Sequence, residues 1–431
     1  MVMKEIFSIL FLFFLINNRS LVSGQNTFIY TDQVFNKKIK SVQLFKEGWN
    51  LSYPVIQLTN GERLVLHFDL LGDEPETYYY SFIHCNKEWQ KSDIYPTDYL
   101  DGFPENQIEK YEPSFNTKIN YYHYSVSFPN DRIGIKLSGN YILIVYPAGN
   151  PEKPVLTKRF MVSEEVAKIV AFAQRPLSAE YYNTGQQVNF TVDFTGLVIN
   201  DPSHDISTSI LQNGQWSNAR TCLKPDLAGN NEVRYLSLSA RNIFPGGNEF
   251  RYFDIKNIRY QSEFVRKIDF VGSSYHVYLK PSENREFKPY FYSQDFNGSY
   301  YVAVQDGRNM ETDADYLYVY FTLPSQYEIT GGRMFVSGAL NNWNFNEDNI
   351  MTYDPDRAEY QCTMLLKQGW YNYEYIFIRD DDKTGEPSLF EGNHYETEND
   401  YLILVYYRSS RDRYDRIIGS DLINSIKQVK K

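Results

Sequence analysis

Apolar side chains recur at every second position along much of this chain, and no other feature restricts its fold as strongly. In residues 63–70 leucines and Phe68 alternate with Arg63, Val65, His67 and Asp69, and residues 188–194 repeat the pattern. A side-chain period of two is that of a β-strand with one buried face. Further apolar and aromatic runs predict strands at residues 78–83, 141–146, 275–279, 316–323, 371–378 and 401–407.

Turn sequences such as Asn60-Gly61 and Pro245-Gly246-Gly247 separate these runs. Helical periodicity is nearly confined to the C-terminal tail. Ser420 is placed there to cap a short helix whose apolar face would consist of Leu422, Ile423, Ile426 and Val429. These elements predict an all-β fold built from immunoglobulin-like or early-set β-sandwiches.

A length of 431 residues is enough for several domains, and 38 tyrosines with 29 phenylalanines suit sheets with wide, half-buried faces. A strand ends near Val162 in a polar segment, and Pro281 and Pro289 lie in a second polar segment. We therefore predict three tandem sandwich domains, at residues 25–163, 164–285 and 286–431.

The N-terminus has the pattern of a secretory signal peptide. Lys4 precedes an apolar run at residues 6–16, and Val22 and Gly24 fit the small-residue positions before a cleavage site. The alternative is a membrane anchor, but this run is shorter than the ~20 residues that a spanning helix needs. We predict a signal peptide at residues 1–24 and no direct membrane span in the mature chain.

The charge and the cysteines limit the partners and the compartment. The formal net charge is −11, and a chain lacking residues 1–24 would carry −12, which disfavours nucleic acid as a partner. Cys85, Cys222 and Cys362 are widely separated and odd in number, so we expect free thiols rather than a disulfide framework. Export of a soluble chain without disulfides is typical of a Gram-negative periplasm.

Several short motifs follow one another in a distinctive order in the first predicted domain. The motifs are His84-Cys85-Asn86-Lys87-Glu88-Trp89, Tyr99-Leu100-Asp101-Gly102-Phe103, Ser114-Phe115-Asn116-Thr117, His123-Tyr124, Phe128-Pro129-Asn130, Ser138-Gly139-Asn140-Tyr141 and Lys158-Arg159-Phe160-Met161-Val162. This order resembles the N-terminal domain of the type IX secretion system plug family of Bacteroidota, formerly a domain of unknown function. The resemblance continues at Gly247-Asn248-Glu249-Phe250-Arg251 and at Gly369-Trp370-Tyr371-Asn372-Tyr373.

This resemblance implies a protein without enzymatic activity in the periplasm, at the periplasmic face of the outer membrane. Such a plug binds the periplasmic opening of a very large outer-membrane β-barrel translocon, with one copy expected per barrel. It closes the barrel sterically while no cargo-binding partner occupies it. No cofactor is expected.

The segment 101–106 is the candidate contact loop for such a partner. It carries Asp101, Phe103 and Asn106 beside turn-forming Gly102 and Pro104. The alternative is an ordered connection whose side chains bond to their own backbone. Asp101, Phe103 and Asn106 are therefore our candidates for partner contact, with this structural role left open.

Known catalytic and metal-binding motifs are absent from the sequence. There is no Gly-x-Ser-x-Gly, His-Glu-x-x-His, Walker loop or Cys-x-x-Cys, so a hydrolase with an unrecognised site is disfavoured. His84 and Cys85 are adjacent on a strand and point to opposite faces, so we interpret them as core residues, not as a metal or catalytic pair. We predict no catalytic, cofactor-binding or metal-binding residues.

An acidic stretch near the end of the chain raises the question of calcium. Glu391, His394, Glu396 and Asp400 form a loose cluster, and Asp380-Asp381-Asp382 precedes it. The alternating ligand spacing of a calcium loop is missing. We interpret the stretch as a solvated acidic turn.

The third predicted domain supports a different function. Residues 335–344 and 369–375 resemble the early-set sandwich of glycogen- and starch-binding modules, in which exposed aromatic side chains stack on sugar rings. Trp343, Trp370 and Tyr373 are the candidates for such a platform. The alternative function is therefore carbohydrate binding, although these side chains can equally fill a core.

Overall fold

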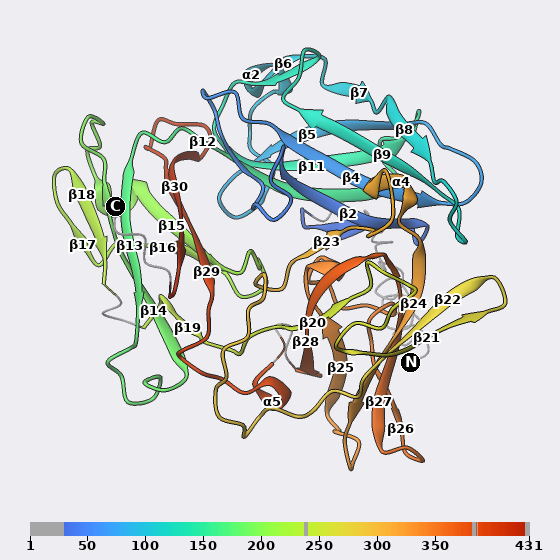
Figure 1. Cartoon of the computed structure of the whole chain (residues 1–431). Coiled ribbons are helices and arrows are strands. Elements are labelled where there is room, and N and C mark those ends of the chain that lie inside the picture. The colour runs from blue at the N-terminus through green and yellow to red at the C-terminus, as the bar shows by residue number, and fades with distance from the viewer. Residues whose placement is uncertain (1–29, 237–239, 382–384, 386, 427–431) are drawn as a thin grey trace, which may run out of the picture. The chain divides into compact units, whose positions relative to one another are not determined.

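Strands form almost all of the regular secondary structure in this computed structural model, which describes residues 30–236, 240–381, 385 and 387–426 (Figure 1). The predicted signal peptide lies outside the described residues. Residues 31–431 form one unit, and the elements below belong to it. Three hydrophobic cores lie in this unit, each lined by strands of different sheets.

The first core lies between two sheets, antiparallel except where β3 pairs in parallel with β12, and runs from Ile39 to Val162. One sheet has the order β1-β12-β11-β5-β7, with β3 beside β12, and the other has the order β2-β4-β9-β8. Phe68 of β4 contacts Tyr78 of β5 edge-on at 5.6 Å, which joins the two layers. The bounds are β1 (Gln33–Val34), β2 (Ile39–Lys46), β3 (Val55–Gln57), β4 (Leu64–Leu71), β5 (Tyr78–Cys85), β7 (Glu105–Gln107), β8 (Lys110–Pro113), β9 (Tyr121–Phe128), β11 (Gly139–Pro147) and β12 (Leu156–Ser163).

A short helix and a two-stranded ribbon complete this part of the chain. They are α2 (Pro96–Tyr99), β6 (Leu100–Gly102) and β10 (Ile133–Ile135). Pro96 opens α2, as its fixed φ allows, and Asp98 accepts a bond from the backbone N–H of Tyr95.

The second core lies between a sheet of order β13-β14-β18-β17, with β19 beside β14, and a sheet of order β16-β15-β29-β30. Its elements are β13 (Lys168–Gln174), β14 (Gly185–Asp193), α3 (Pro202–Asp205), β15 (Ile206–Gln212), β16 (Arg220–Leu223), β17 (Leu227–Ala228), β18 (Glu232–Tyr235), β19 (Ile243–Pro245), β29 (Asp400–Tyr407) and β30 (Arg416–Asn424).

The third core lies between a sheet of order β20-β28-β23, with β25 beside β28, and a sheet of order β21-β22-β24-β27-β26. Its elements are β20 (Arg251–Asp254), β21 (Val265–Val271), β22 (Ser274–Leu279), β23 (Tyr300–Val302), α4 (Met310–Asp313), β24 (Tyr316–Pro324), β25 (Gly332–Ser337), η1 (Ala339–Asn341), β26 (Thr352–Asp354), β27 (Glu359–Lys367), β28 (Gly369–Arg379) and α5 (Ser388–Glu391).

The all-β sandwich fold predicted from the sequence is confirmed, and so are the strands predicted at residues 63–70 and 188–194 and in the listed runs. Many tyrosines lie inside the cores rather than on half-buried faces. The rings with under 2% exposure include Tyr78, Tyr80, Tyr124, Tyr371 and Tyr401.

The sheets do not follow the predicted domain boundaries after residue 164. Strands β20, β21 and β22 come from the predicted second domain, but β20 pairs with β28 and β22 pairs with β24 of the third core, with β21 at the edge beside β22. Strands β29 and β30 come from the predicted third domain but extend the sheet of β15. Hydrogen bonds to strands far away in the sequence decide this placement, and local polar segments do not reveal them. The division into three domains stays a prediction, and the sheets cross its predicted limit at residue 285.

The predicted C-terminal helix is wrong. Ser420, Leu422 and Ile423 belong to β30, which pairs along its length with β29. Pairing with a long buried strand satisfies more backbone groups than one short exposed helix, so tertiary structure overrides the local spacing. Val429 lies outside the described residues.

Candidate functional site

Strand β4 is buried on both faces, although its alternating pattern predicts one solvated face. Asp69 is 0% exposed, and His67 is half-buried. The face that carries these two side chains is covered by α4 and by the facing ends of β24 and β27, which supply Tyr316 and Lys367. This second face of β4 is where polar groups from distant parts of the chain converge.

Two cross-strand pairs build the centre of this convergence. Asp69 of β4 lies opposite His123 of β9, and Tyr316 of β24 lies opposite Lys367 of β27. Asp69 accepts bonds from His123 Nδ1 at 2.7 Å, from the Tyr316 hydroxyl at 2.7 Å and from Lys367 Nζ at 2.6 Å. The carboxylate therefore joins the first and third cores through one buried ion pair.

The charges at this centre are compensated within it. Burial alone would raise the pKa of Asp69, but the Lys367 ammonium and His123 outweigh it and lower that pKa below its usual value. Lys367 also donates to the backbone carbonyl of Glu311 at 2.7 Å and lies over the Tyr121 ring at 4.1 Å. The Tyr121 hydroxyl in turn donates to the carbonyl of Ala314 at 2.8 Å, which fixes the chain around α4.

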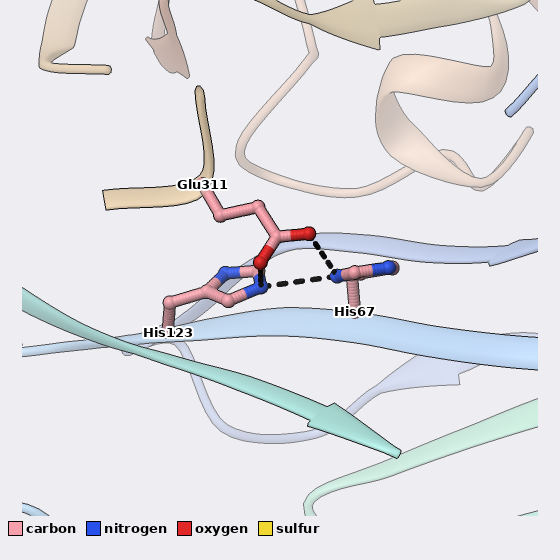
Figure 2. Close-up of side chains that lie close together, drawn as sticks. All are labelled: His67, His123 and Glu311. Carbon is pink, nitrogen blue, oxygen red and sulfur yellow. Dashed lines mark hydrogen bonds and ion pairs between the residues drawn. The ribbon is translucent and has the colours of Figure 1, made fainter. Parts of the chain in front are cut away.

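Figure 2 shows that His67, His123 and Glu311 point toward one another beside this centre. His67 Nδ1 lies 3.0 Å from His123 Nε2 and 3.5 Å from a carboxylate oxygen of Glu311, whose other oxygen lies 3.4 Å from His123 Nε2. Glu311 lies in α4, which begins after Asn309, whose side chain accepts from the Glu311 N–H. Burial lowers the pKa of His67 to about 3, so its imidazole is neutral at neutral pH.

A cavity of about 320 Å³ opens onto these side chains. Its walls include Ser41, Gln43, His67, Arg308 and Glu311. Glu311 keeps 39% of its side chain exposed, so small solutes reach the carboxylate. Among the described residues, this is the one group of three or more histidine, cysteine and acidic side chains arranged to hold a metal ion.

In the predicted contact loop, some candidate side chains are exposed to solvent and one is buried within the loop. Phe103 is 73% exposed and Asp101 is exposed, whereas Asn106 is only 5% exposed. Asn106 Nδ2 donates to the Phe103 carbonyl at 2.6 Å, and the Phe103 N–H donates to the Arg132 carbonyl at 3.2 Å. Asn106 therefore holds the loop, which displays Asp101 and Phe103. Their contact with a partner stays a prediction.

The three predicted platform aromatics do not form one exposed surface. Tyr373 is 4% exposed in the third core, where its hydroxyl lies 3.2 Å from that of Ser282, so its prediction as a platform residue is wrong. Its strand packs this ring inward against Phe253. The sequence period alone does not say which face of a strand is buried.

The two tryptophans are half-buried among neighbouring rings. Trp370 lies between Tyr252 and Tyr301, at interplanar angles of 17° and 12°, and Phe296 packs edge-on against it at 4.6 Å. Trp343 lies so close to Gly298 that an added Cβ there would be 2.3 Å from its ring. Sugar binding by Trp343 and Trp370 stays a prediction, without Tyr373.

His84 and Cys85 are both buried, as interpreted from the sequence. His84 Nδ1 lies 2.8 Å from the Ser92 hydroxyl and Nε2 lies 3.1 Å from the Ser138 carbonyl. Cys85, Cys222 and Cys362 are free thiols. Each histidine nitrogen has a partner within the fold, so the pair has a structural role.

The acidic stretch between β28 and β29 is only partly the solvated turn that we predicted: Asp380, Asp381 and Glu396 are exposed, but Glu391 is buried. Glu391 is 1% exposed and accepts bonds from Arg251 Nε and Arg285 Nε, both at 2.9 Å, and from the Tyr375 N–H at 2.8 Å. Burial raises its pKa, and the two guanidinium groups outweigh burial and lower it. Arginines far away in the sequence compensate the charge, and local composition does not reveal them. Asp382 lies outside the described residues.

The polar centre was missed by reasoning from the sequence. His67 and Asp69 are two residues apart and so share one face of a strand, which is a signal for a polar site on an otherwise apolar strand. Glu311 and Lys367 come from segments more than 200 residues away, and only the tertiary structure brings them there.

Comparisons with known proteins agree with the fold. The family model for the type 9 secretion system plug protein 1st domain matches residues 39–164, which span the first core. A crystal structure of a hypothetical protein from Parabacteroides merdae aligns with a TM-score of 0.88 and 33% identity, covering 91% of this chain and 99% of that chain.

A second structure, dimeric latent PorU from Porphyromonas gingivalis, aligns at 11% identity with a TM-score of 0.13, covering 90% of this chain and 34% of that chain. That score shows no shared fold, and we draw nothing from it. The search of curated proteins finds no match. In the described part of the chain, no helix has the length and hydropathy of a membrane span. The family match over the first core, together with the relative that aligns along nearly the whole chain, shows that this chain belongs to the type 9 secretion system plug protein family.

Proposed function

We propose that this protein is a periplasmic plug of the type IX secretion system. It binds the periplasmic opening of the outer-membrane translocon barrel and closes it sterically while no cargo-binding partner occupies the barrel. The observation that carries the proposal is the plug-domain match over residues 39–164. The mechanism needs a folded body and a binding surface, with no chemistry on a substrate and one copy per barrel.

The exposed end of the first core offers a surface for this contact. Tyr95, which precedes α2, is 70% exposed, and Phe103, which follows β6, is 73% exposed. Large aromatic side chains commonly supply much of the binding energy at protein interfaces. Tyr95, Asp101 and Phe103 are therefore the side chains that we assign to contact with the barrel.

The loop that carries Phe103 is held in one conformation before any partner binds. Gly102 has φ of +93°, and an added Cβ would lie 2.1 Å from the Arg132 carbonyl oxygen, so glycine is required there. Bonds from Asn106 and to Arg132 fix the backbone of Phe103. A loop fixed in advance loses little conformational entropy on binding.

The first test is an affinity purification from detergent-solubilised outer membranes with a tagged copy of the protein. We expect one very large β-barrel to co-purify, without its cargo-binding partner. The double variant Tyr95→Ala/Phe103→Ala should recover at least about tenfold less barrel, since two interface aromatics commonly contribute more than 1.4 kcal/mol together. Phe287→Ala is the matched control, because Phe287 is an aromatic side chain that is 89% exposed and lies outside the first core.

Recovery and barrier measurements can contradict the function and the contact surface separately. Recovery of the tagged protein without any barrel would contradict the proposed binding to the translocon. Equal recovery by the double variant and the control would leave the plug function standing but move the contact surface elsewhere. A strain that lacks the protein should also have a leaky outer membrane when its translocon has no cargo-binding partner, and an intact barrier would contradict closure.

A further inference from the structure

The distances among His67, His123 and Glu311 match those between the ligands of a bound metal ion. A tetrahedral Zn²⁺ site has bonds of about 2.0–2.1 Å to nitrogen and oxygen, which places neighbouring ligand atoms about 3.3 Å apart. The three separations in this structure are 3.0, 3.5 and 3.4 Å. The ligand atoms are therefore already spaced as the three corners of one face of such a site.

Asp69 orients His123 for this role. His123 Nδ1 lies 2.7 Å from the Asp69 carboxylate, which also accepts from Lys367 Nζ and the Tyr316 hydroxyl, so Nδ1–H is the donor in this contact. With Nδ1 as the donor, Nε2 is the nitrogen that faces His67 and Glu311. A carboxylate that holds the outer nitrogen of a ligating histidine is the usual support of a metal-binding imidazole.

This arrangement leaves two acceptors facing each other. With Nδ1 protonated, His123 Nε2 and a Glu311 oxygen are both electron-pair donors, at 3.4 Å. A cation between them, either a second proton on His123 or a metal ion, relieves the repulsion. His67 Nδ1 lies 3.0 Å from His123 Nε2 and 3.5 Å from Glu311. With its proton on Nδ1, His67 donates to one of them; with its proton on Nε2, it adds a third lone pair that a metal ion joins to the other two.

We propose that His67, His123 and Glu311 bind one divalent transition-metal ion, with Zn²⁺ the best match to two imidazoles and one carboxylate. The fourth position faces the cavity of about 320 Å³, which leaves it to water or to a small ligand. Lys367 does not oppose the ion, because its charge is compensated by Asp69 at 2.6 Å. The proposal goes beyond the plug function and holds whether or not the protein closes a barrel.

The ion would join parts of the chain that lie far apart in sequence. His67 and His123 belong to β4 and β9 of the first core, whereas Glu311 belongs to α4, just before β24 of the third core. Binding to the folded state alone stabilises that state by mass action, so thermal stability should rise with the concentration of free metal.

The test uses the purified chain, stripped with a chelator, and Zn²⁺ alone as the probe. Calorimetric titration should show one Zn²⁺ per chain, and Zn²⁺ should raise the melting temperature. His67→Gln and Glu311→Gln should each weaken binding by at least about 100-fold, since removal of a ligand exceeds the 10–100-fold cost of losing its supporting group. They should also abolish the rise in melting temperature. His204→Gln is the matched control, because His204 keeps 82% of its side chain exposed beside Asp201, and it should bind as the parent does.

Glu311→Gln keeps the test decisive if His67→Gln fails to fold, because the Glu311 side chain is 39% exposed. Absence of saturable Zn²⁺ binding to the parent chain would overturn the proposal. Unchanged affinity in both ligand variants would do the same, because the ion would then bind elsewhere. A doubly protonated His123 at neutral pH, seen by nitrogen NMR in the presence of Zn²⁺, would show that the second proton occupies the site instead.

Discussion

His84 is a buried imidazole whose neutrality links the stability of the chain to pH. Its ring is 1% exposed and both nitrogens are bonded to Ser92 and Ser138. Burial lowers its pKa from 6.5 to about 4, while the Ser138 carbonyl opposes that shift. Between these two values the unfolded chain binds a proton that the folded chain does not.

The stabilisation from this depressed pKa is complete above pH 6.5 and is lost as pH falls toward 4. At pH 5 the solution lies about 1.5 pH units below the pKa of His84 in the unfolded chain. Protonation of the unfolded chain at His84 should therefore lower the free energy of unfolding by about 2 kcal/mol. The measurement is urea unfolding of the parent chain and His84→Asn at pH 7.5 and pH 5.

The comparison between parent and variant matters because other groups titrate in the opposite sense. Burial raises the pKa of Asp295 to about 8, so that carboxyl stabilises the fold as pH falls. The loss between pH 7.5 and pH 5 should be smaller in His84→Asn than in the parent, whereas exposed His204→Gln should match the parent. Equal losses in the parent chain and in His84→Asn would contradict the assignment.

At the scale of elements, β29 is the strand that departs furthest from the predicted domain order. Its residues Tyr401, Ile403 and Val405 are 0% exposed and belong to the second core, between β15 and β30. The strand thus ties the C-terminal part of the sequence to a core that begins near residue 167.

Ile403→Ala should therefore destabilise the second core, with a cost of about 2–5 kcal/mol for a large buried aliphatic side chain. Leu422→Ala is the matched control on β30, because Leu422 is 41% exposed, and it should change stability by less than about 0.5 kcal/mol. Denaturant unfolding measures both. Equal, small effects would contradict the placement of β29 in a core.

Strands were the part of the fold that local sequence could predict. The period of two at residues 63–70 and the runs of tyrosine identify them, because burial of one face leaves a local trace. The tail helix was wrong, since Leu422 and Ile423 satisfy a helical spacing by chance while β29 supplies their hydrogen bonds.

The polar centre, too, could be predicted only in part from local sequence. His67 and Asp69 share a strand face that sequence alone can identify, but their partners cannot be read from it. Lys367 and Glu311 reach Asp69 and His67 only when the first and third cores pack together, and no local pattern encodes that contact. Phe103 was found from turn chemistry, whereas the burial of Asn106 depends on the bond that it makes to the same loop.

At the scale of the whole molecule, the ion pair between Asp69 and Lys367 connects the first and third cores. The two side chains are 0% and 2% exposed. A buried pair contributes little net stability when intact, but removal of one partner leaves a buried charge uncompensated.

Lys367→Met should therefore cost about 3–5 kcal/mol. The second change Asp69→Asn in the same chain should recover part of that loss, because it removes the uncompensated charge. Lys37→Met is the control: Lys37 pairs with Glu347 across the same two parts of the chain, but both side chains are more than three-quarters exposed, at 80% and 89%. Unfolding free energies of the four proteins test this, and a Lys367→Met cost as small as that of the control would contradict it.

The return of β29 and β30 to the sheet of β15 also bears on the order in which the chain can mature. On the proposal that this chain is exported, it emerges from its N-terminus, so the first core can close once residue 163 has crossed the membrane. The second core cannot, because the strand that covers β15 lies some 190 residues downstream of it. Until residues 400–424 arrive, β15 presents an open edge to solvent, and an unpaired edge of this kind invites pairing with other chains. On that proposal, the middle of the chain needs protection until its C-terminal strands arrive, a requirement that a simple row of self-contained modules would not impose.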